Sequence, residues 1–179
     1  MTDTIDIKLT QAAQARREHR PADALNLYGQ AQTEARESAN AVQLARALSG
    51  LGQIRRDADD KASALAHYTE AVDVLRAANE PMHLAHTLRH AGDIASQLGD
   101  FEMARTYIAE ALTIYRNHPE VAPLELANTL RVSALNAERG ALAAWQEAKT
   151  LYAVVDVQAG IDGAQHHVRH LSASLEGIS

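Results

Sequence analysis

Apolar residues recur along the chain at helical spacing, in four copies of one pattern. Each copy has Ala, then a large residue four positions later, then Ala three positions after that, and it stays apolar at the next turn. Spacings of three and four put these side chains on one face of a helix. The copies begin 40, 40 and 37 positions apart. They are Ala24, Tyr28, Ala31 and Ala35; Ala64, Tyr68, Ala71 and Leu75; Ala104, Ile108, Ala111 and Tyr115; and Ala141, Trp145, Ala148 and Tyr152.

A second pattern precedes the last three copies and predicts another helix in each repeat. Three nine-residue segments align without gaps, and a weaker copy follows them near the end of the chain. Two kinds of helix therefore alternate with a period near 40 residues. The segments are 44–52 (LARALSGLG), 84–92 (LAHTLRHAG), 126–134 (LANTLRVSA) and the weaker 164–171 (AQHHVRHL).

Helix breakers agree with this division. The segment 98–104 (LGDFEMA) predicts a helix stop at Gly99 and an N-cap at Asp100. Val and Ile form no short alternating runs that would indicate strands. The four prolines fall between predicted helices, where a missing backbone donor does no harm: Pro21, Pro81, Pro119 and Pro123.

The periodicity therefore predicts an all-α fold, an α-solenoid of antiparallel helix pairs within a single domain, 1–179. We expect about four repeats and a C-terminal capping helix with a polar outer face. The alternative is a generic Ala-rich helical bundle. The predicted repeats are 6–38, 41–79, 82–118 and 122–156, and the predicted capping helix is 158–175.

These residues resemble the tetratricopeptide repeat family over roughly 6–171. In that family a Leu-Gly pair in the first helix, and Ala, an aromatic residue and Ala in the second, let paired helices approach closely. Leu51-Gly52 and Ala91-Gly92 match the first helix, and the four patterns above match the second. A period longer than the common ~34 residues is similar to kinesin light chains and many bacterial regulators. The resemblance implies a superhelix that binds other proteins.

Two departures from the family pattern affect the prediction. The first repeat has TQAAQA where Leu-Gly is expected. In the fourth repeat Leu130 and Ala141 are 11 positions apart, whereas Leu48–Ala64 and Leu88–Ala104 are each 16 apart. A tight turn at NAERG, or an early end of the first helix near Gly140, is therefore expected there. With that turn, Trp145 should be buried like its counterparts Tyr28, Tyr68 and Ile108.

Composition narrows the functional classes. The 179 residues carry a formal net charge of −6, which argues against a nucleic-acid partner. There is no Cys, so thiolate metal sites are excluded. The N-terminal segment lacks a signal-peptide layout and no apolar run approaches ~20 residues, so a cytoplasmic protein without a membrane partner is expected.

No enzymatic motif is present, and no catalytic residue or cofactor is predicted. Histidine offers the one candidate chemistry, because two trios lie at helical spacing and imidazole and carboxylate groups can hold a divalent metal. Without a fourth ligand in the sequence, exposed helical histidines are the favoured reading and no metal is expected. The trios are His83, His86 and His90, and Asp162, His166 and His170.

The family resemblance also implies which residues face a ligand. In tetratricopeptide proteins the first helix of each pair lines a concave groove, and its second and fifth motif positions point toward the ligand. The second positions map to Arg46, His86, Asn128 and His166, and the fifth to Ser49, Arg89, Arg131 and Arg169, with His90 and His170 at the sixth.

This groove is expected to be basic, because the acidic residues accumulate on the second helices. Arginines that are simply solvated, or paired with acids such as Asp93 or Glu125, are the alternative. The Lys and Asn clamp of chaperone-binding members is absent, since Ser49, Gln53 and Val132 are among the residues in its place.

The leading functional hypothesis is an adaptor that binds a peptide or protein segment, acidic or extended, in the groove. The alternative is a homodimeric structural or regulatory module, since solenoid ends often pair about two-fold axes. A histidine-based metal-binding protein is the remote third.

Overall fold

The computed structural model describes residues 4–118, 123–154 and 156–177, and these residues form eight α-helices without any strand. None of the helices in these ranges combines the length and apolar character needed to cross a membrane. The helices are α1 (Thr4–Arg17), α2 (Pro21–Glu37), α3 (Ala41–Asp57), α4 (Lys61–Ala77), α5 (Pro81–Gln97), α6 (Phe101–Arg116), α7 (Pro123–Val154) and α8 (Gln158–Glu176).

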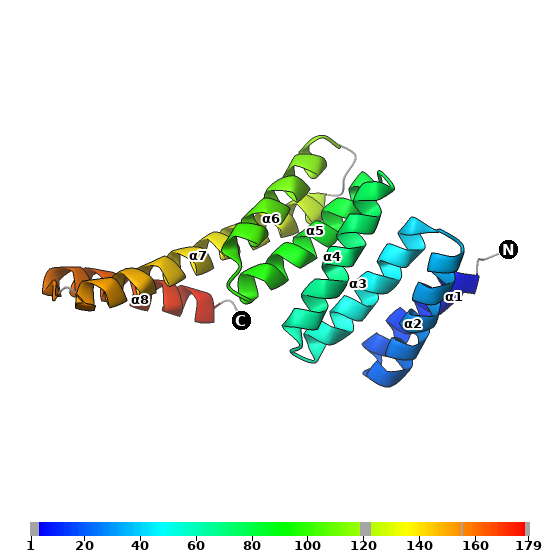
Figure 1. Cartoon of the computed structure of the whole chain (residues 1–179), viewed down its shortest axis with the longest axis horizontal. Helices are drawn as coiled ribbons and strands as arrows, with labels where there is room; N and C mark the ends of the chain where they lie inside the picture. Colours follow the sequence, from blue (N-terminus) through cyan, green and yellow to red (C-terminus); the bar gives the residue numbers. More distant parts are fainter. Residues whose placement is uncertain (1–3, 119–122, 155, 178–179) are drawn as a thin grey trace.

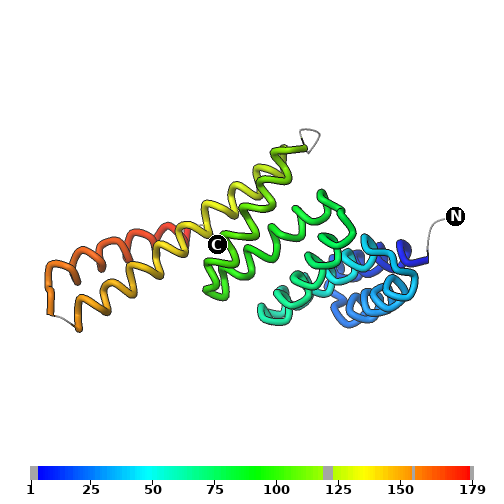
Figure 2. Tube along the Cα trace, turned by 45° about the horizontal axis from the view of Figure 1, so that its top comes forward, coloured from blue at the N-terminus to red at the C-terminus, as the bar shows by residue number. Residues whose placement is uncertain are grey.

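Three antiparallel helix pairs, α1–α2, α3–α4 and α5–α6, stack side by side in chain order (Figure 1). The first half of α7 packs on α5 and α6, and its second half extends away from the stack with α8 folded back along it (Figure 2). The prediction of an all-α solenoid is confirmed.

The chain reverses direction between these helices through turns of one geometry. Three residues separate consecutive helices from α1 to α6, and the middle residue of each turn has a left-handed φ between 53° and 86°. The amide after it donates to a carbonyl five residues back, as from Asp100 to Ala95 at 2.9 Å. This is the Schellman closure, which satisfies carbonyls at the helix end. The left-handed residues are His19, Ala39, Asp59, Asn79 and Gly99.

The predicted helix stop at Gly99 and the N-cap at Asp100 are confirmed. Gly99 has φ +86°, and the Asp100 side chain accepts a hydrogen bond from the Met103 amide at 3.0 Å. Asn40 and Asp60 cap α3 and α4 in the same way. An unpaired helix-end donor is satisfied at each of these three positions.

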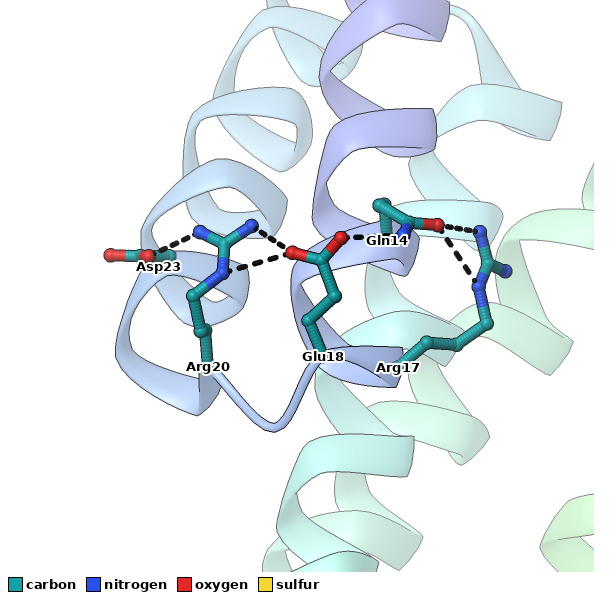
Figure 3. Close-up of polar contacts among 5 residues, drawn as sticks. All are labelled: Gln14, Arg17, Glu18, Arg20 and Asp23. Carbon is teal, nitrogen blue, oxygen red and sulfur yellow. Dashed lines mark hydrogen bonds and ion pairs between the residues drawn. The ribbon is translucent and has the colours of Figure 1, made fainter.

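A polar network covers the first turn, between α1 and α2 (Figure 3). Arg20 donates to Glu18 at 2.6 Å and to Asp23 at 2.5 Å, so its side chain joins the turn to the start of α2. Gln14 donates to Glu18 at 2.6 Å and accepts from Arg17 at 2.8 Å. All five side chains are exposed, so this network contributes little stability and chiefly orders the turn.

The core is formed where large residues of second helices meet small residues of first helices. Tyr28 lies against Gly50 of the next pair, and Tyr68 lies against Gly52 of its own pair. Ile108 packs on Gly92 in the same manner, and Tyr28, Tyr68 and Ile108 are buried as predicted. Ala71 and Ala111, at the third position of their patterns, are also fully buried. Small side chains at these contacts let the helix axes approach closely.

The fourth repeat departs from the prediction. No turn interrupts the segment NAERG, and α7 runs as a single helix of 32 residues through Gly140. Trp145 is therefore not enclosed within a fourth pair. It is half-buried and stacks on His167 of α8, with ring centroids 4.1 Å apart. The expected burial of Trp145 is wrong. Without the turn, Trp145 packs against α8 and not against the first half of α7.

We expect the close approach at Gly50 to be sensitive to a single methyl group. A Cβ on Gly50 would overlap the Tyr28 ring, whereas a Cβ on Gly29 would meet no atom within 4 Å. Gly50→Ala should lower the free energy of unfolding by about 1–3 kcal/mol through overpacking. Gly29→Ala, its control, should raise it by roughly 0.5–1 kcal/mol because Ala favours a helix interior. Chemical denaturation followed by circular dichroism measures both, and equal stabilities would contradict the packing described.

Candidate groove across the first helices

A groove crosses the first helices of the three stacked pairs and encloses a cavity of about 430 Å³. Its floor is apolar and its rim carries polar side chains from α3 and α5. The floor residues are Leu9, Ala13, Tyr28, Ala45, Gly50 and Leu75, and the rim residues are Arg46, Ser49, Gln53, His83, His86 and Thr87. Three predicted site residues, Arg46, Ser49 and His86, therefore lie together.

Arg46 is the cationic group of this rim. It is exposed, and its guanidinium donates to the Asp6 carboxylate of α1 at 2.6 Å. Such an exposed pair is worth about 0.2–1 kcal/mol, so another carboxylate can replace Asp6 with little loss. Arg16 and Arg17 of α1 lie near enough, with Arg46, to oppose the effect of burial, which raises the Tyr28 pKa. Arg16, like Arg46, is itself paired with a carboxylate, that of Asp57 at 2.8 Å.

On the α5 side of the groove lies a layer of packed rings, of which Tyr68 is buried and His86 and His90 are partly buried. The His90 ring stacks on Tyr68 with centroids 5.6 Å apart and meets His86 edge-on at 4.8 Å. Burial is the main cause that lowers the pKa of His90 to about 2, and neighbouring His86 and Arg89 lower it further. Burial also lowers the pKa of His86, again with Arg89 acting in the same direction. Both rings are therefore held neutral in the folded protein.

Arg89 is mostly buried and faces Glu125 of α7 at 3.4 Å. It lies in the contact between α5 and α7 and not on the open groove. The structure therefore does not support the expectation that Arg89 faces a ligand. A buried guanidinium with a carboxylate partner holds helices in register more readily than it binds a ligand.

The remaining predicted site residues lie on α7 and α8. Asn128 and the exposed Arg131 are on the first half of α7, and Arg131 has no ion pair among the residues that the structure describes. His166, Arg169 and His170 are exposed on α8, which lies at the far end of the molecule from α1 (Figure 1). One concave wall of all ten residues is therefore not formed, because α8 pairs with the protruding half of α7.

These positions correct two expectations about the groove. Of the four mapped arginines only Arg46 borders the groove, because Arg89 is paired with Glu125 and because Arg131 and Arg169 lie on α7 and α8. The two histidines add little positive charge to the groove near neutral pH, because burial keeps His90 neutral there and opposes protonation of His86. Periodicity cannot reveal this burial, because the motif position is the same in exposed and enclosed repeats.

Neither histidine trio gathers into a metal site. Among the described residues, no three His, Asp or Glu side chains lie close enough to hold an ion. His86 and His90 contact each other, but His90 faces the Tyr68 ring and His83 lies beside Glu80 at 3.7 Å.

The residues of the groove floor were not among those predicted from the motif positions. Leu9 and Ala13 come from α1, whose sequence lacks the Leu-Gly signature that fixed the register of the other first helices. Their spacing of four on a helix preceding the first pattern was the signal available for them. Tyr28 reaches the groove because Gly50 beside it has no side chain.

Comparison with known proteins agrees with this architecture. Residues 85–118, which comprise most of α5 and all of α6, match the tetratricopeptide repeat family model. This segment is therefore a tetratricopeptide-type repeat, in agreement with the resemblance seen in the sequence. Repeats of this kind generally mediate protein–protein interactions, and the solenoids they build are generally non-catalytic scaffolds.

Among solved structures, the fold is similar to that of BtubC (BKLC) from P. vanneervenii, with a TM-score of 0.62 and 16% sequence identity. The match covers 97% of this chain and 65% of that one, so the chain spans just under two thirds of the BtubC structure. No curated protein matches the sequence. The structural likeness shows the shared fold alone.

The neutral state of His90 predicts a pH dependence of stability. Its folded pKa lies below the ordinary ~6.5, so the unfolded chain binds the extra proton and stability falls as pH drops below that value. One such proton contributes about 1.4 kcal/mol per pH unit. His90→Gln should therefore lose stability less steeply than the parent between pH 6 and pH 4, by up to this amount. Denaturant titrations over this range decide it, and identical slopes for the variant and the parent would contradict the burial of His90.

Proposed function

We propose that this protein is a non-catalytic binding module that holds a segment of a partner protein in the groove across α1, α3 and α5. The observation that supports the proposal is the groove itself, a cavity of about 430 Å³ with an apolar floor and a polar rim on three consecutive first helices. Concave surfaces of solenoids are extended, which suits a segment that crosses several repeats.

The lining indicates the chemistry of the bound segment. The partly exposed Ala13, with the small exposed parts of Leu9 and Tyr28, gives the floor an apolar surface, so the segment presents at least one apolar side chain to it. Arg46 then pairs with a carboxylate on the segment, in exchange for Asp6. A guanidinium suits this role because its fork of donors matches a carboxylate. The preferred segment therefore carries an apolar residue next to an acidic one.

Polar rim groups fix the backbone of the segment. Ser49 and Gln53 lie one turn apart on α3 and His86 lies opposite on α5, all bordering the cavity. A neutral His86 ring can donate from one nitrogen and accept at the other, whereas a protonated ring only donates. Because burial lowers the His86 pKa, this dual capacity persists near neutral pH.

Charge reversal at Arg46 tests the proposal. Peptides would be selected from a displayed random library on the parent protein and their affinities measured by calorimetry. Arg46→Glu should weaken binding of the selected peptides about tenfold to a hundredfold, the range expected for one charged hydrogen bond. Raising the salt concentration should weaken binding to the parent in the same direction, since the rim is exposed.

Arg36→Glu is the matched control. Arg36 is also exposed and also joins two helices, because it lies on α2 and pairs with Glu70 of α4. Neither residue lines the groove. This variant should bind the selected peptides like the parent. If Arg46→Glu and Arg36→Glu bind equally, or if the selected sequences contain no acidic residue, the proposed groove specificity is wrong.

A further inference from the structure

The first half of α7 aligns without gaps with α3 and α5, which allows each face of the helix to be compared. The face toward the preceding pair is covered in all three helices, and Thr129 of α7 is fully buried there. Val132 on the same side of α7 packs against Ile108 and Leu112 of α6. The first half of α7 therefore occupies the ordinary place of a first helix.

The opposite face of this half of α7 is uncovered. Leu48 and Leu88 are fully buried beneath their own second helices, whereas the aligned Leu130 is 45% exposed. Gly52 and Gly92 touch Tyr68 and Ile108 of their own second helices, whereas the aligned Ala134 is exposed. Among the residues that the structure describes, no second helix covers this face.

The second half of α7 has a complementary uncovered face. It carries the pattern of a second helix, and α8 covers one side of it, where Trp145 stacks on His167. Tyr152 also packs on α8, against Gly160. The side that would meet a first helix is open, because Leu151 is 59% exposed and Ala144 is also exposed. The first half of α7 therefore lacks a second helix against its open face, and the second half lacks a first helix against its own.

The two halves of α7 have these open faces because the link between them is too short to form a turn. From Gly92 to Ala104 eleven residues intervene, and from Ala134 to Ala141 only six intervene, so five residues are absent. The three-residue turn with its left-handed member lies within the missing stretch, and α7 continues as a helix. A second helix joined without a turn cannot fold back on its own first helix.

We propose that α7 pairs with α7 of a second copy of this chain, antiparallel about a two-fold axis near Gly140, so that each copy completes the fourth repeat of the other. The contact of Gly92 with Ile108 corresponds to Ala134 of one copy facing Trp145 of the second. The same relation places Leu130 opposite Lys149 and Ala127 opposite Tyr152. Exchange of an identical element between copies is a low-cost route to a dimer.

The geometry and charge of α7 fit this partner. A helix of 32 residues is about 48 Å long, and an axis near Gly140 lies close to its middle, so nearly its whole length overlaps. An apolar stripe runs along this face of α7, and Trp145, Lys149 and Tyr152 flank it. The residues of the stripe are uncharged: Ala127, Leu130, Ala134, Ala137, Ala141, Ala144, Ala148 and Leu151. This surface is separate from the groove across α1, α3 and α5, so the inference does not rest on the proposed function.

Mass in solution is the first test. Size-exclusion chromatography with light scattering should give twice the 19.4 kDa of one chain for the parent. Leu130→Lys should give the single-chain mass, because each new ammonium group would face Lys149 of the other copy and like charges repel across an interface. Leu98→Lys, at an equally exposed leucine on the turn after α5, is the control and should remain dimeric. A monomeric parent, or a Leu130→Lys variant that stays dimeric, overturns the proposal.

Disulfide trapping tests the antiparallel arrangement, and the chain has no native Cys to interfere. A Leu130→Cys chain mixed with a Lys149→Cys chain should form a cross-linked heterodimer on mild oxidation. Leu130→Cys mixed with Glu147→Cys is the control, since Glu147 points to a different side of α7, and it should cross-link several-fold less. Equal cross-linking in the two mixtures overturns the arrangement even if the parent is dimeric.

Restoring the missing turn tests whether its absence is the cause of dimerisation. Inserting QLGDF, the sequence at 97–101, between Glu138 and Arg139 supplies the five missing residues in register. The longer chain should then close the fourth repeat on itself and run at the mass of one chain, with its helical content retained by circular dichroism. A folded insertion variant that is still dimeric overturns the exchange.

Discussion

Chain reversal through a three-residue turn is the constraint on which this architecture depends. Each turn contains one residue with a left-handed φ and brings the next helix back antiparallel, so that large residues of a second helix meet small residues of the first. A lone helix pair cannot bury its whole apolar face, and so the pairs must also stack on one another. Where the reversal is present, as from α1 to α6, the core is continuous. Where it is absent, in α7, apolar side chains such as Leu130 are exposed.

The two interaction surfaces follow from these two situations. Regular stacking brings α1, α3 and α5 side by side and creates a groove with an apolar floor, beside which Arg46 is held by a replaceable partner, Asp6. Because α7 continues without a turn, its two halves each have an open face that fits the other, but they cannot fold against each other within one chain. The first surface suits a partner segment, and the second suits another copy of the chain. A protein with both would present two grooves on one two-fold assembly.

Sequence periodicity was sufficient to predict the helices, the stop at Gly99 and the burial of Tyr68, because each depends on local spacing or on turn chemistry. It was insufficient for α7, since a shortened link can be read either as a tight turn or as no turn, and only the backbone geometry decides. The groove was predicted in part. Arg46, Ser49 and His86 come together, but His90 and Arg89 are enclosed by Tyr68 and by Glu125, neighbours from other repeats that a motif position does not specify.

The continuity of α7 is the central claim, and a distance measurement between spin labels tests it most directly. Labels on cysteines at the exposed positions Arg131 and Glu147 would be diluted with unlabelled chain, so that only distances within one chain contribute. A continuous helix places these backbone positions about 24 Å apart. A fourth repeat closed within one chain would instead place its two helices at the ~8–10 Å spacing of packed helices and shorten this distance by roughly half or more. A single distribution centred near the longer distance is the predicted result, and a dominant short distance would contradict this account.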